Sequence, residues 1–483
     1  MKKNRKRTEK KIWIERGKTA LIFFLVFCCA YFLYLIFDIF KEQVSMDKIF
    51  WSSENISSVQ PAQENSSNNV VTVYRHFSEP ETILINGVNS HKKIPEDGQF
   101  RTEILEEINS KMQDLYFSDN KNVVVSDIAE WTNAIKESSL YIKYPCPRFT
   151  DFEEEFFAAE NSISKYIKSY QDVVLTVGAV ADTGVTAFVR EYSTDKIIKI
   201  ILDSESKTLR DLIKSYQDDG QNPYMFAYEL NLDENSITEG VNDRVTLARM
   251  LLLPTGNLYT GGVRITVPRI YKGGVNFTTT TQVTEGLISI FGFNPNTIRQ
   301  YSNSDGALMF VGETGSLSVH PKGRIEYKAL GKNEGIPLTR NSQNTAAYSI
   351  ISGLSTLTES IFKTCGINEE RHDAKLKITA FPQKGNKLNL SFDYYVDEYK
   401  VKFDDGAAVD AVVENGVITE LKMLVKAIEK TEDKNENEEI LRAIDRFCQE
   451  NSDITKISEG RLVYEYKKGE NETITVWEVQ GVK

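Results

Sequence analysis

The alternation of apolar and polar residues divides the chain into an apolar N-terminal run and a long patterned remainder. Residues 19–37 (TALIFFLVFCCAYFLYLIF) carry no formal charge over nineteen positions. As a helix this run is about 28 Å long at 1.5 Å per residue, which is enough to cross the hydrocarbon core of a bilayer. Because backbone polar groups must be satisfied internally in hydrocarbon, the run predicts a single transmembrane helix.

The eighteen residues before this run contain nine Lys or Arg and two Glu, a formal charge of +7. The positive-inside rule therefore predicts a single-pass protein of the cell membrane with a cytoplasmic N-terminus and extracellular C-terminal domains. A cleaved signal peptide is the alternative, but it has a shorter apolar core and small residues at the cleavage site. Residues 37–41 (FDIFK) supply no small pair, which favours an uncleaved anchor.

The pattern beyond the anchor predicts a linker and three folded segments. Residues 52–69 are polar and unpatterned, which is typical of a flexible tether, and alternation begins at Val71. The predicted divisions are a basic cytoplasmic tail at 1–18, a transmembrane helix at 19–40, a flexible linker at 41–70, an N-terminal α+β domain at 71–220, a middle α+β domain with a C-terminal β-meander at 224–335, and a C-terminal α+β domain at 344–483.

Apolar periods of three and four residues predict helices, and period-two alternation predicts strands. Predicted helices cover 100–116, 127–139 with Asp127 as N-cap, 152–170, 206–216, 284–291, 344–365 closed by Gly366, and 439–451. Predicted strands include 140–144, 173–180, 186–192, 196–203, 225–232, 244–253, 264–270, a meander within 307–330, 375–381, 387–399, 399–405, 409–413, 417–427, 461–466 and 473–479. Asn415-Gly416 is a hairpin turn signal. Residues 429–439 are predicted to form a charged loop.

The connections between these strands are short, so the sheets are expected to be mainly antiparallel and packed with helices, which makes the fold class α+β. An apolar content of 41% is typical of globular domains. The whole chain has a net charge of −11, and residues 19–483 alone have −18. Such an acidic body repels nucleic acid and anionic lipid headgroups, so no nucleic-acid partner is expected.

The five cysteines are too sparse and too widely spaced for a disulfide framework or a metal cluster. Cys28 and Cys29 lie within the predicted membrane helix, and Cys146, Cys365 and Cys448 lie outside it. A Cys365–Cys448 disulfide is one alternative, and three small buried thiols are the other.

Motifs that would indicate catalysis are weak. The four histidines (His76, His91, His320 and His372) are not spaced as metal ligands, and the nucleotide-binding, zinc-protease and hydrolase motifs are missing from the sequence. Asp182-Thr183-Gly184 matches the aspartic-protease triplet, but that chemistry needs two carboxylates and no second triplet occurs. A hairpin turn between Val180 and Thr186 explains it better.

Two further patterns have an ordinary structural explanation. Ser162 with Lys165, and Ser204 with Lys207, match the S-x-x-K pattern of penicillin-binding proteins, but the motifs that accompany it there do not follow. Tyr394, Tyr395 and Tyr399 suggest a sugar-stacking platform. If they lie on one strand, Tyr395 and Tyr399 share a face and Tyr394 takes the other, so sheet surface and core are the better interpretation.

The membrane helix itself carries a distinctive pattern. Phe24, Phe27, Tyr31 and Tyr34 recur at spacings of three and four and form one aromatic stripe. Lipid contact and interfacial anchoring are one explanation, and a contact face for a partner membrane helix is the other.

The tail, the membrane helix and the large acidic α+β remainder resemble the YycH regulators of Gram-positive bacteria. The likeness is clearest at 293–330, with Arg299, an Asp305-Gly306 turn, an aromatic strand, a second strand and the ending GRIEY from Gly323 to Tyr327. The C-terminal part resembles the related YycI module. The similar features there are the Tyr-rich strands at 392–403, the Asn415-Gly416 hairpin and the closing strand at 474–479 with Trp477.

This resemblance implies two-component system regulation rather than catalysis, with no enzyme activity, cofactor or metal site. The implied partner is a membrane sensor histidine kinase of the WalK type, which controls cell-wall metabolism, and a sister regulatory protein is a further candidate partner. Contact is expected through membrane helices and extracytoplasmic domains. The alternatives are a general binding or assembly module of the cell envelope and, with less support, a peptidoglycan-active enzyme.

Overall fold

The computed structural model describes residues 79–482 apart from short gaps, of which the longest are 234–244, 271–281 and 339–346. The predicted tail, transmembrane helix and linker at 1–70 lie outside the described residues. Among the residues that are described, no helix combines the length and the apolar character needed to cross a membrane.

The first large sheet has nine strands, and every pairing in it is antiparallel. Its order is β10-β8-β2-β1-β4-β5-β6-β7-β3. The strands are β1 (Thr82–Gly87), β2 (Ser90–Lys93), β3 (Val123–Ser126), β4 (Ser139–Phe149), β5 (Ser169–Val177), β6 (Val185–Glu191), β7 (Ile197–Leu202), β8 (Pro223–Phe226) and β10 (Leu252–Pro254).

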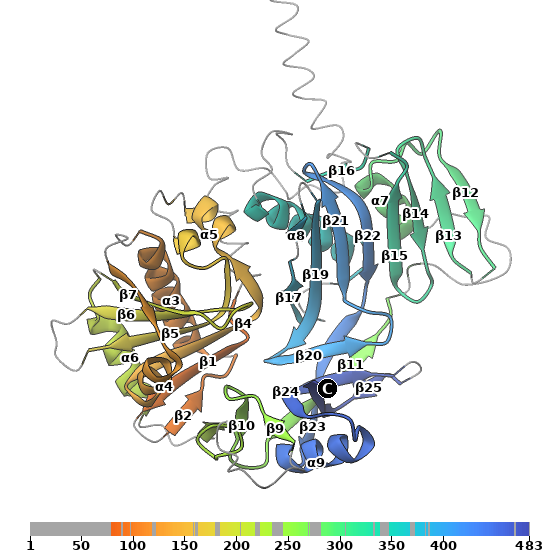
Figure 1. Ribbon diagram of the computed structural model, residues 1–483. Helices are drawn as coiled ribbons and strands as arrows, with labels where there is room; N and C mark the ends of the chain where they lie inside the picture. Colours follow the sequence, from red (N-terminus) through yellow and green to blue (C-terminus); the bar gives the residue numbers. More distant parts are fainter. Residues whose placement is uncertain are drawn as a thin grey trace, which may run out of the picture. The chain divides into compact units, whose positions relative to one another are not determined.

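Helices cover both faces of this sheet. Successive residues of a strand point to opposite sides, so each strand contributes apolar side chains to both faces. Ile85, Leu140 and Leu175 form one apolar core with α3 (Gln99–Phe117) and α6 (Lys207–Gln217). On the other face, Leu84, Tyr141 and Val174 form a second core with α4 (Ile128–Lys136), from which Trp131 is fully buried. The nine-stranded sheet is therefore the middle layer between helices (Figure 1).

Local signals in this half are partly confirmed. The helix predicted at 100–116 is α3, and Asp127 caps α4 by accepting a hydrogen bond from the Glu130 N–H at 2.8 Å. The helix predicted at 152–170 is wrong. Only α5 (Thr150–Phe157) and a short 3-10 turn η2 (Ile163–Lys165) form, and β5 starts at Ser169 because Tyr170 is buried in the sheet core.

The second large sheet has fourteen strands, and its main path runs β12-β13-β14-β15-β22-β21-β19-β20-β24-β26. The strands of that path are β12 (Arg299–Ser302), β13 (Leu308–Val311), β14 (Gly315–Val319), β15 (Arg324–Ala329), β19 (Lys387–Val396), β20 (Tyr399–Phe403), β21 (Val409–Glu414), β22 (Val417–Leu424), β24 (Lys456–Tyr466) and β26 (Thr475–Val482). Off the path, β16 (Ile336–Pro337) pairs with β22, β17 (Lys375–Ala380) and β18 (Gln383–Lys384) pair with β19, and β9 (Thr246–Leu247) pairs with β24.

The helices α7 (Gln282–Ile290) and α8 (Ala347–Thr364) bury their apolar residues against this sheet, with Leu354 and Phe310 in the same core. A small third sheet consists of β23 (Ala427–Glu436), β11 (Tyr259–Thr266) and β25 (Glu472–Thr473). The last helix, α9 (Ile440–Glu450), packs with β24 and β26. Only the β20–β24 and β9–β24 ladders are parallel among the described strands, so the mainly antiparallel α+β fold is confirmed.

Turn chemistry explains the hairpin between β21 and β22. Asn415 and Gly416 both have positive φ, 53° and 79°, as the tight hairpin turn signalled by Asn-Gly requires. The meander β13–β15 and the helix α8, followed by Gly366 with φ of 77°, are also confirmed.

Three predictions in this region are wrong. Residues 429–436 of the charged loop predicted at 429–439 belong to β23 (Ala427–Glu436), because β11 supplies a pairing partner from a distant part of the chain. The strand predicted at 225–232 ends at Phe226, where the chain turns and the Glu229 carboxylate accepts the Phe226 N–H at 2.9 Å. The strand predicted at 244–253 is split into β9 and β10, which pair in different sheets.

The predicted domain boundaries stay predictions. The described strands show that β8 and β10 belong to the nine-stranded sheet, whereas β9 and β11 pair with strands from the C-terminal part of the chain.

Candidate functional site

Charged side chains join the nine-stranded sheet to the fourteen-stranded sheet. Lys93 of β2 lies 3.1 Å from Glu398, in the turn between β19 and β20. Glu96 pairs with Lys377 of β17, and Glu81 lies 3.9 Å from Arg461 of β24. We call these three pairs the ionic seam. Burial alone would lower the pKa of Lys93, but the Glu398 carboxylate outweighs it and raises that pKa, so the cation is kept.

Glu96 is the most enclosed member of the ionic seam. Its carboxylate meets both the Lys377 ammonium and the Arg101 guanidinium, the latter at 3.0 Å. The side chains of Glu96, Lys377 and Arg101 are only 4%, 2% and 4% exposed. Lys377 also lies over the ring of Tyr395, 5.1 Å from its centroid, which is a favourable position for a cation.

The burial of the Glu96–Lys377 pair decides what this part of the ionic seam can do. Moving two charges out of water costs free energy that offsets their attraction, so a buried ion pair adds little net stability. Removing one of the two side chains strongly destabilises the protein, because the other charge stays buried without its partner. The ionic seam therefore specifies how the two sheets meet more than it holds them together.

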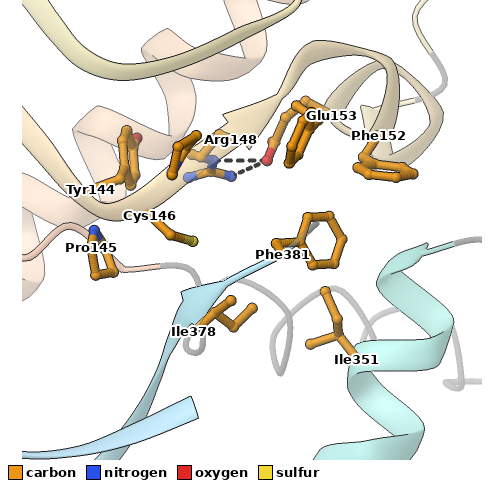
Figure 2. Close-up of a pocket in the computed structure, with 11 residues that line it drawn as sticks. Tyr144, Pro145, Cys146, Arg148, Phe152, Glu153, Ile351, Ile378 and Phe381 are labelled. Atoms are coloured by element: carbon orange, nitrogen blue, oxygen red, sulfur yellow. Dashed lines mark hydrogen bonds and ion pairs between the residues drawn. The ribbon is translucent and has the colours of Figure 1, made fainter. Parts of the chain in front are cut away.

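A small cavity lies at the same contact between the two sheets (Figure 2). It has a volume of about 30 Å³, which is room for one or two water molecules. Figure 2 shows Tyr144, Cys146, Phe152 and Glu153 on the side of β4 and α5, facing Ile378, Phe381 and Ile351 on the side of β17 and α8. The cavity is too small for an organic substrate, and it marks incomplete packing between the sheets.

An ion pair borders this cavity. Arg148 donates from Nε to the Glu153 carboxylate at 2.8 Å and stacks 4.4 Å from the ring centroid of Tyr144. The Cys146 thiol beside it is 8% exposed, and burial raises its pKa to about 12. Because the thiolate is the reactive form, Cys146 is held unreactive at neutral pH.

The nine-stranded sheet contains a buried chain of polar side chains that no sequence motif indicates. The carboxylate of Glu229 accepts from His91 Nε2 at 3.0 Å, and the Asn86 side-chain oxygen lies 2.8 Å from His91 Nδ1. Asn86 in turn donates to the Ser139 hydroxyl at 2.9 Å. An amide, not the imidazole, touches the hydroxyl of the fully buried Ser139, so this chain does not activate a nucleophile. His91 and Glu229 lie 138 positions apart, and no local pattern signals their contact.

The predicted catalytic motifs are not brought together as a site among the described residues. Asp182, Thr183 and Ser162 lie outside them, and β5 and β6 on either side of residues 178–184 pair as an antiparallel hairpin, as expected of a turn. Ser204 precedes α6, whose first residue Lys207 is exposed. Within the described ranges, no group of three or more His, Cys, Asp or Glu side chains is placed to hold a metal ion.

The described cysteines and His372 have structural environments. Cys146, Cys365 and Cys448 are free thiols, so the alternative of a Cys365–Cys448 disulfide is wrong. Burial raises the pKa of Cys365 to about 12. Burial lowers the pKa of His372 to about 4, and this neutral ring accepts the Ile428 N–H at Nδ1, 3.3 Å away.

Tyr394, Tyr395 and Tyr399 do not form a sugar-stacking platform. Tyr394 and Tyr395 are fully buried, in agreement with the structural interpretation. The predicted sharing of a face by Tyr395 and Tyr399 is wrong, because the chain turns after Val396 and Tyr399 begins β20. Val396 pairs with Tyr399, so Tyr399 shares a face with Tyr394 instead. The candidate partner-contact residues Phe24, Phe27, Tyr31 and Tyr34 lie outside the described residues.

The fold and the site together define a class of protein: an α+β body with two large, mainly antiparallel sheets, whose contact combines the buried Glu96–Lys377 pair, two partly exposed ion pairs and apolar packing. No model of a known protein family matches the sequence, and no curated protein matches it. Among solved structures the fold is similar to the crystal structure of YycH from Bacillus subtilis, with a TM-score of 0.52 and 14% sequence identity. The similarity covers 84% of this chain and 96% of that chain. It confirms the YycH-like fold.

Proposed function

We propose that the protein is a membrane-anchored extracytoplasmic regulator of a sensor histidine kinase in a cell-envelope two-component system. It acts through contacts of its membrane helix and its folded domains, and it is not an enzyme. The observation that carries the proposal is the fold similarity to YycH, which extends over nearly the whole of that chain. The basic tail and the uncharged run at 19–37 support a single-pass anchor with the folded domains outside.

A regulator of this kind works by binding one state of the kinase better than another. A ligand shifts a conformational equilibrium only by its difference in affinity for the two states. A change from a 1:99 to a 99:1 population needs about 5.5 kcal/mol of such difference, and smaller biases need less. We propose that the aromatic stripe of Phe24, Phe27, Tyr31 and Tyr34 supplies part of this difference in the membrane.

Outside the membrane, we propose that the ionic seam gives the regulator its own two arrangements. Closure of the Glu96–Lys377 pair requires both sheets to be in place, because the two residues come from opposite sides of the contact. The kinase binds one of these two arrangements of the sheets. The membrane helix then contacts the kinase in the position that belongs to the bound arrangement.

The test is a replacement of the stripe in the full-length protein in its own cells. Phe24, Phe27, Tyr31 and Tyr34 are changed together to Leu, and the phosphorylation of the response regulator is measured. The proposal predicts altered kinase output. A matched control changes Phe32 to Leu, since this aromatic lies off the stripe of the same helix.

Crosslinking in intact membranes, followed by identification of the captured proteins, separates this function from its alternatives. Recovery of a histidine kinase supports the regulator. Recovery of envelope proteins without any histidine kinase would instead support a general binding or assembly module. Unchanged output in both helix variants would remove the membrane-helix contact from the proposal.

A further inference from the structure

In the described part of the chain, three short stretches link the two large sheets, and all three lie at one edge of the nine-stranded sheet. After β8 the chain turns and reaches Asp233, which bridges Leu247 of β9 in the other sheet. Residues 248–251 then lead back to β10, and residues 255–258 lead on to β11, which pairs with β23. We call residues 248–258 the crossing segment. Because β10 and β8 stand first in the strand order, the covalent links gather at that edge.

The contact at β4 has no such link. In the strand order, β4 lies four spacings from β10, which is about 19 Å at about 4.8 Å per spacing. There β4 lies against β17, and α5 lies against α8. Pro145 and Pro147 of β4 have no N–H to donate to a ladder with β17. None of the described ladders pairs these two strands, so side-chain contacts join the sheets here, around the cavity of Figure 2.

Two buried polar atoms beside this contact have no hydrogen-bond partner among the described residues. They are Oε2 of Glu96 and the hydroxyl of Tyr395, a residue that is 1% exposed. The Lys377 ammonium of β17 meets the other oxygen of Glu96 and lies over the Tyr395 ring. Burying a polar atom without a partner costs free energy. Separation of the sheets at this contact would hydrate both atoms, which offsets part of the cost of exposing the apolar side chains around the cavity.

We propose that the crossing segment is a hinge about which the nine-stranded and fourteen-stranded sheets open at the contact between β4 and β17. This hinge supplies the axis for the two arrangements of the proposed function, on which it rests. A rotation of about 15° would move β4 by about 5 Å, because the lever is about 19 Å long. Such a movement separates Glu96 from Lys377 and opens the cavity to water.

Backbone hydrogen bonds place one pivot early in the crossing segment. The Ala248 N–H donates to the Ile457 C=O of β24 at 2.7 Å. The Leu251 C=O instead accepts the N–H of Ala227, the residue after β8, at 2.9 Å. The anchoring of the chain therefore changes from one sheet to the other across residues 249–250, and a few residues between fixed elements are the usual form of a hinge.

A second change of anchoring follows β10. Pro254 pairs with Tyr224 of β8, whereas the Leu258 C=O accepts the Asn437 N–H at 2.9 Å, just beyond β23. Gly256 lies between these anchors, and a Cβ built there would meet no atom within 4 Å. A glycine in open space lets the backbone change φ and ψ at little cost, as a second pivot requires.

Thiol labelling of the full-length protein in its membrane tests the hinge, because two native cysteines report on different places. Cys146 borders the cavity, and Cys365 lies in the core between α8 and the fourteen-stranded sheet. They are 8% and 6% exposed, and burial raises the pKa of both to about 12. N-ethylmaleimide reacts with the thiolate, so labelling requires that a thiol reach water. Peptide mass spectrometry measures each rate, and Cys146 is expected to react several-fold faster than Cys365.

Lys377→Met removes an ion pair that only the closed arrangement contains. It should speed the labelling of Cys146 about tenfold and leave that of Cys365 unchanged. Lys328→Met, which removes an exposed ion pair, is the matched control and should change neither rate.

Leu258→Cys locates the axis. This position is 8% exposed, like Cys146, but it lies at the end of the crossing segment. Its surroundings stay closed when the sheets turn about the hinge, so Lys377→Met should not speed labelling there. Thermal unfolding checks that the Leu258→Cys variant folds.

Three results would overturn the hinge. They are a Cys146 rate no faster than that of Cys365 in the natural protein, a Cys146 rate that Lys377→Met leaves unchanged, and equal speeding of Cys146 and Leu258→Cys by Lys377→Met, which would mean that the whole contact separates or the protein unfolds. None of these rates depends on a kinase, so failure of the hinge is distinct from failure of the proposed regulation.

Discussion

The apolar cores of the nine-stranded sheet and the ionic seam beside it are stabilised by different physics. In the cores, side chains such as Trp131 and Ile142 are fully buried among apolar neighbours, and each large apolar side chain contributes about 1.5–3 kcal/mol by leaving water. In the ionic seam, Glu96 and Lys377 are as deeply buried but gain little net free energy, since desolvation offsets their attraction. The contact between the sheets is also partly apolar, since Cys146, Phe149 and Phe152 pack in one core with Ile378 and Phe381. The ionic seam therefore adds specificity to that contact rather than most of its free energy.

The largest effect is expected in the apolar core. Trp131→Ala removes a fully buried side chain between α4 and the sheet and should lower the free energy of unfolding by about 3–5 kcal/mol. Denaturant unfolding measures the loss. Tyr301→Ala on β12 is the control, because that ring is 53% exposed and surface changes usually stay within about 0.5 kcal/mol. Equal effects of the two changes would contradict the assigned core.

A smaller effect is expected in the ionic seam. Lys377→Met leaves the Glu96 carboxylate with Arg101 as its remaining cation and should cost about 1–3 kcal/mol in denaturant unfolding. Adding Glu96→Gln should restore part of that loss, because the buried charge is then removed together with its partner. Lys328→Met breaks an exposed pair with Glu420, and should cost about 0–1 kcal/mol. A double variant as unstable as the sum of its parts would show that the two side chains do not interact.

The smallest effect concerns acid stability at the polar chain of His91. Burial alone would raise the pKa of Glu229, but hydrogen bonds from His91 and from the Phe226 N–H outweigh it and lower the pKa below its ordinary value of 4.5. A depressed carboxyl pKa contributes stability above the unfolded-state value, and that contribution disappears as the pH falls through the folded-state value.

Glu229→Gln should therefore be less stable than the natural protein at neutral pH and should lose less stability between pH 6 and pH 3, as measured by unfolding at each pH. Glu420→Gln, at an exposed carboxylate, is the matched control. A pH dependence for Glu229→Gln that matches the natural protein would show that this carboxyl does not contribute.

Local chemistry made much of the fold predictable. The 3.6-residue period between Ile104 and Leu115 predicts α3, because both side chains must reach the same sheet. Asp127 and Asn415-Gly416 mark a helix start and a hairpin through hydrogen bonding and positive φ that depend on one or two residues. Such signals can be recognised in the sequence because they depend on neighbouring residues and need no distant partner.

What the sequence could not reveal depends on partners far along the chain. Glu429 and Lys430 read as loop residues on composition, but they form β23 because β11 lies beside them. Glu96 and Lys377 are 281 positions apart, so neither carries a sign that it belongs to a buried pair. The ionic seam and the chain from Ser139 to Glu229 were unpredictable for this reason, while the fold class was not.

The pairing of β24 has a consequence for how the chain is made. This strand, near the C-terminus, lies parallel to both β20 and β9, and β25 completes the small sheet around β11. During synthesis the ribosome releases β9, β11 and β20 long before residues 456–473 exist, and strand pairing between distant segments is intrinsically slow. Without residues 456–473, β9, β11 and β20 would each lack a strand that pairs with them, so these three edges stay open until β24 and β25 have been made.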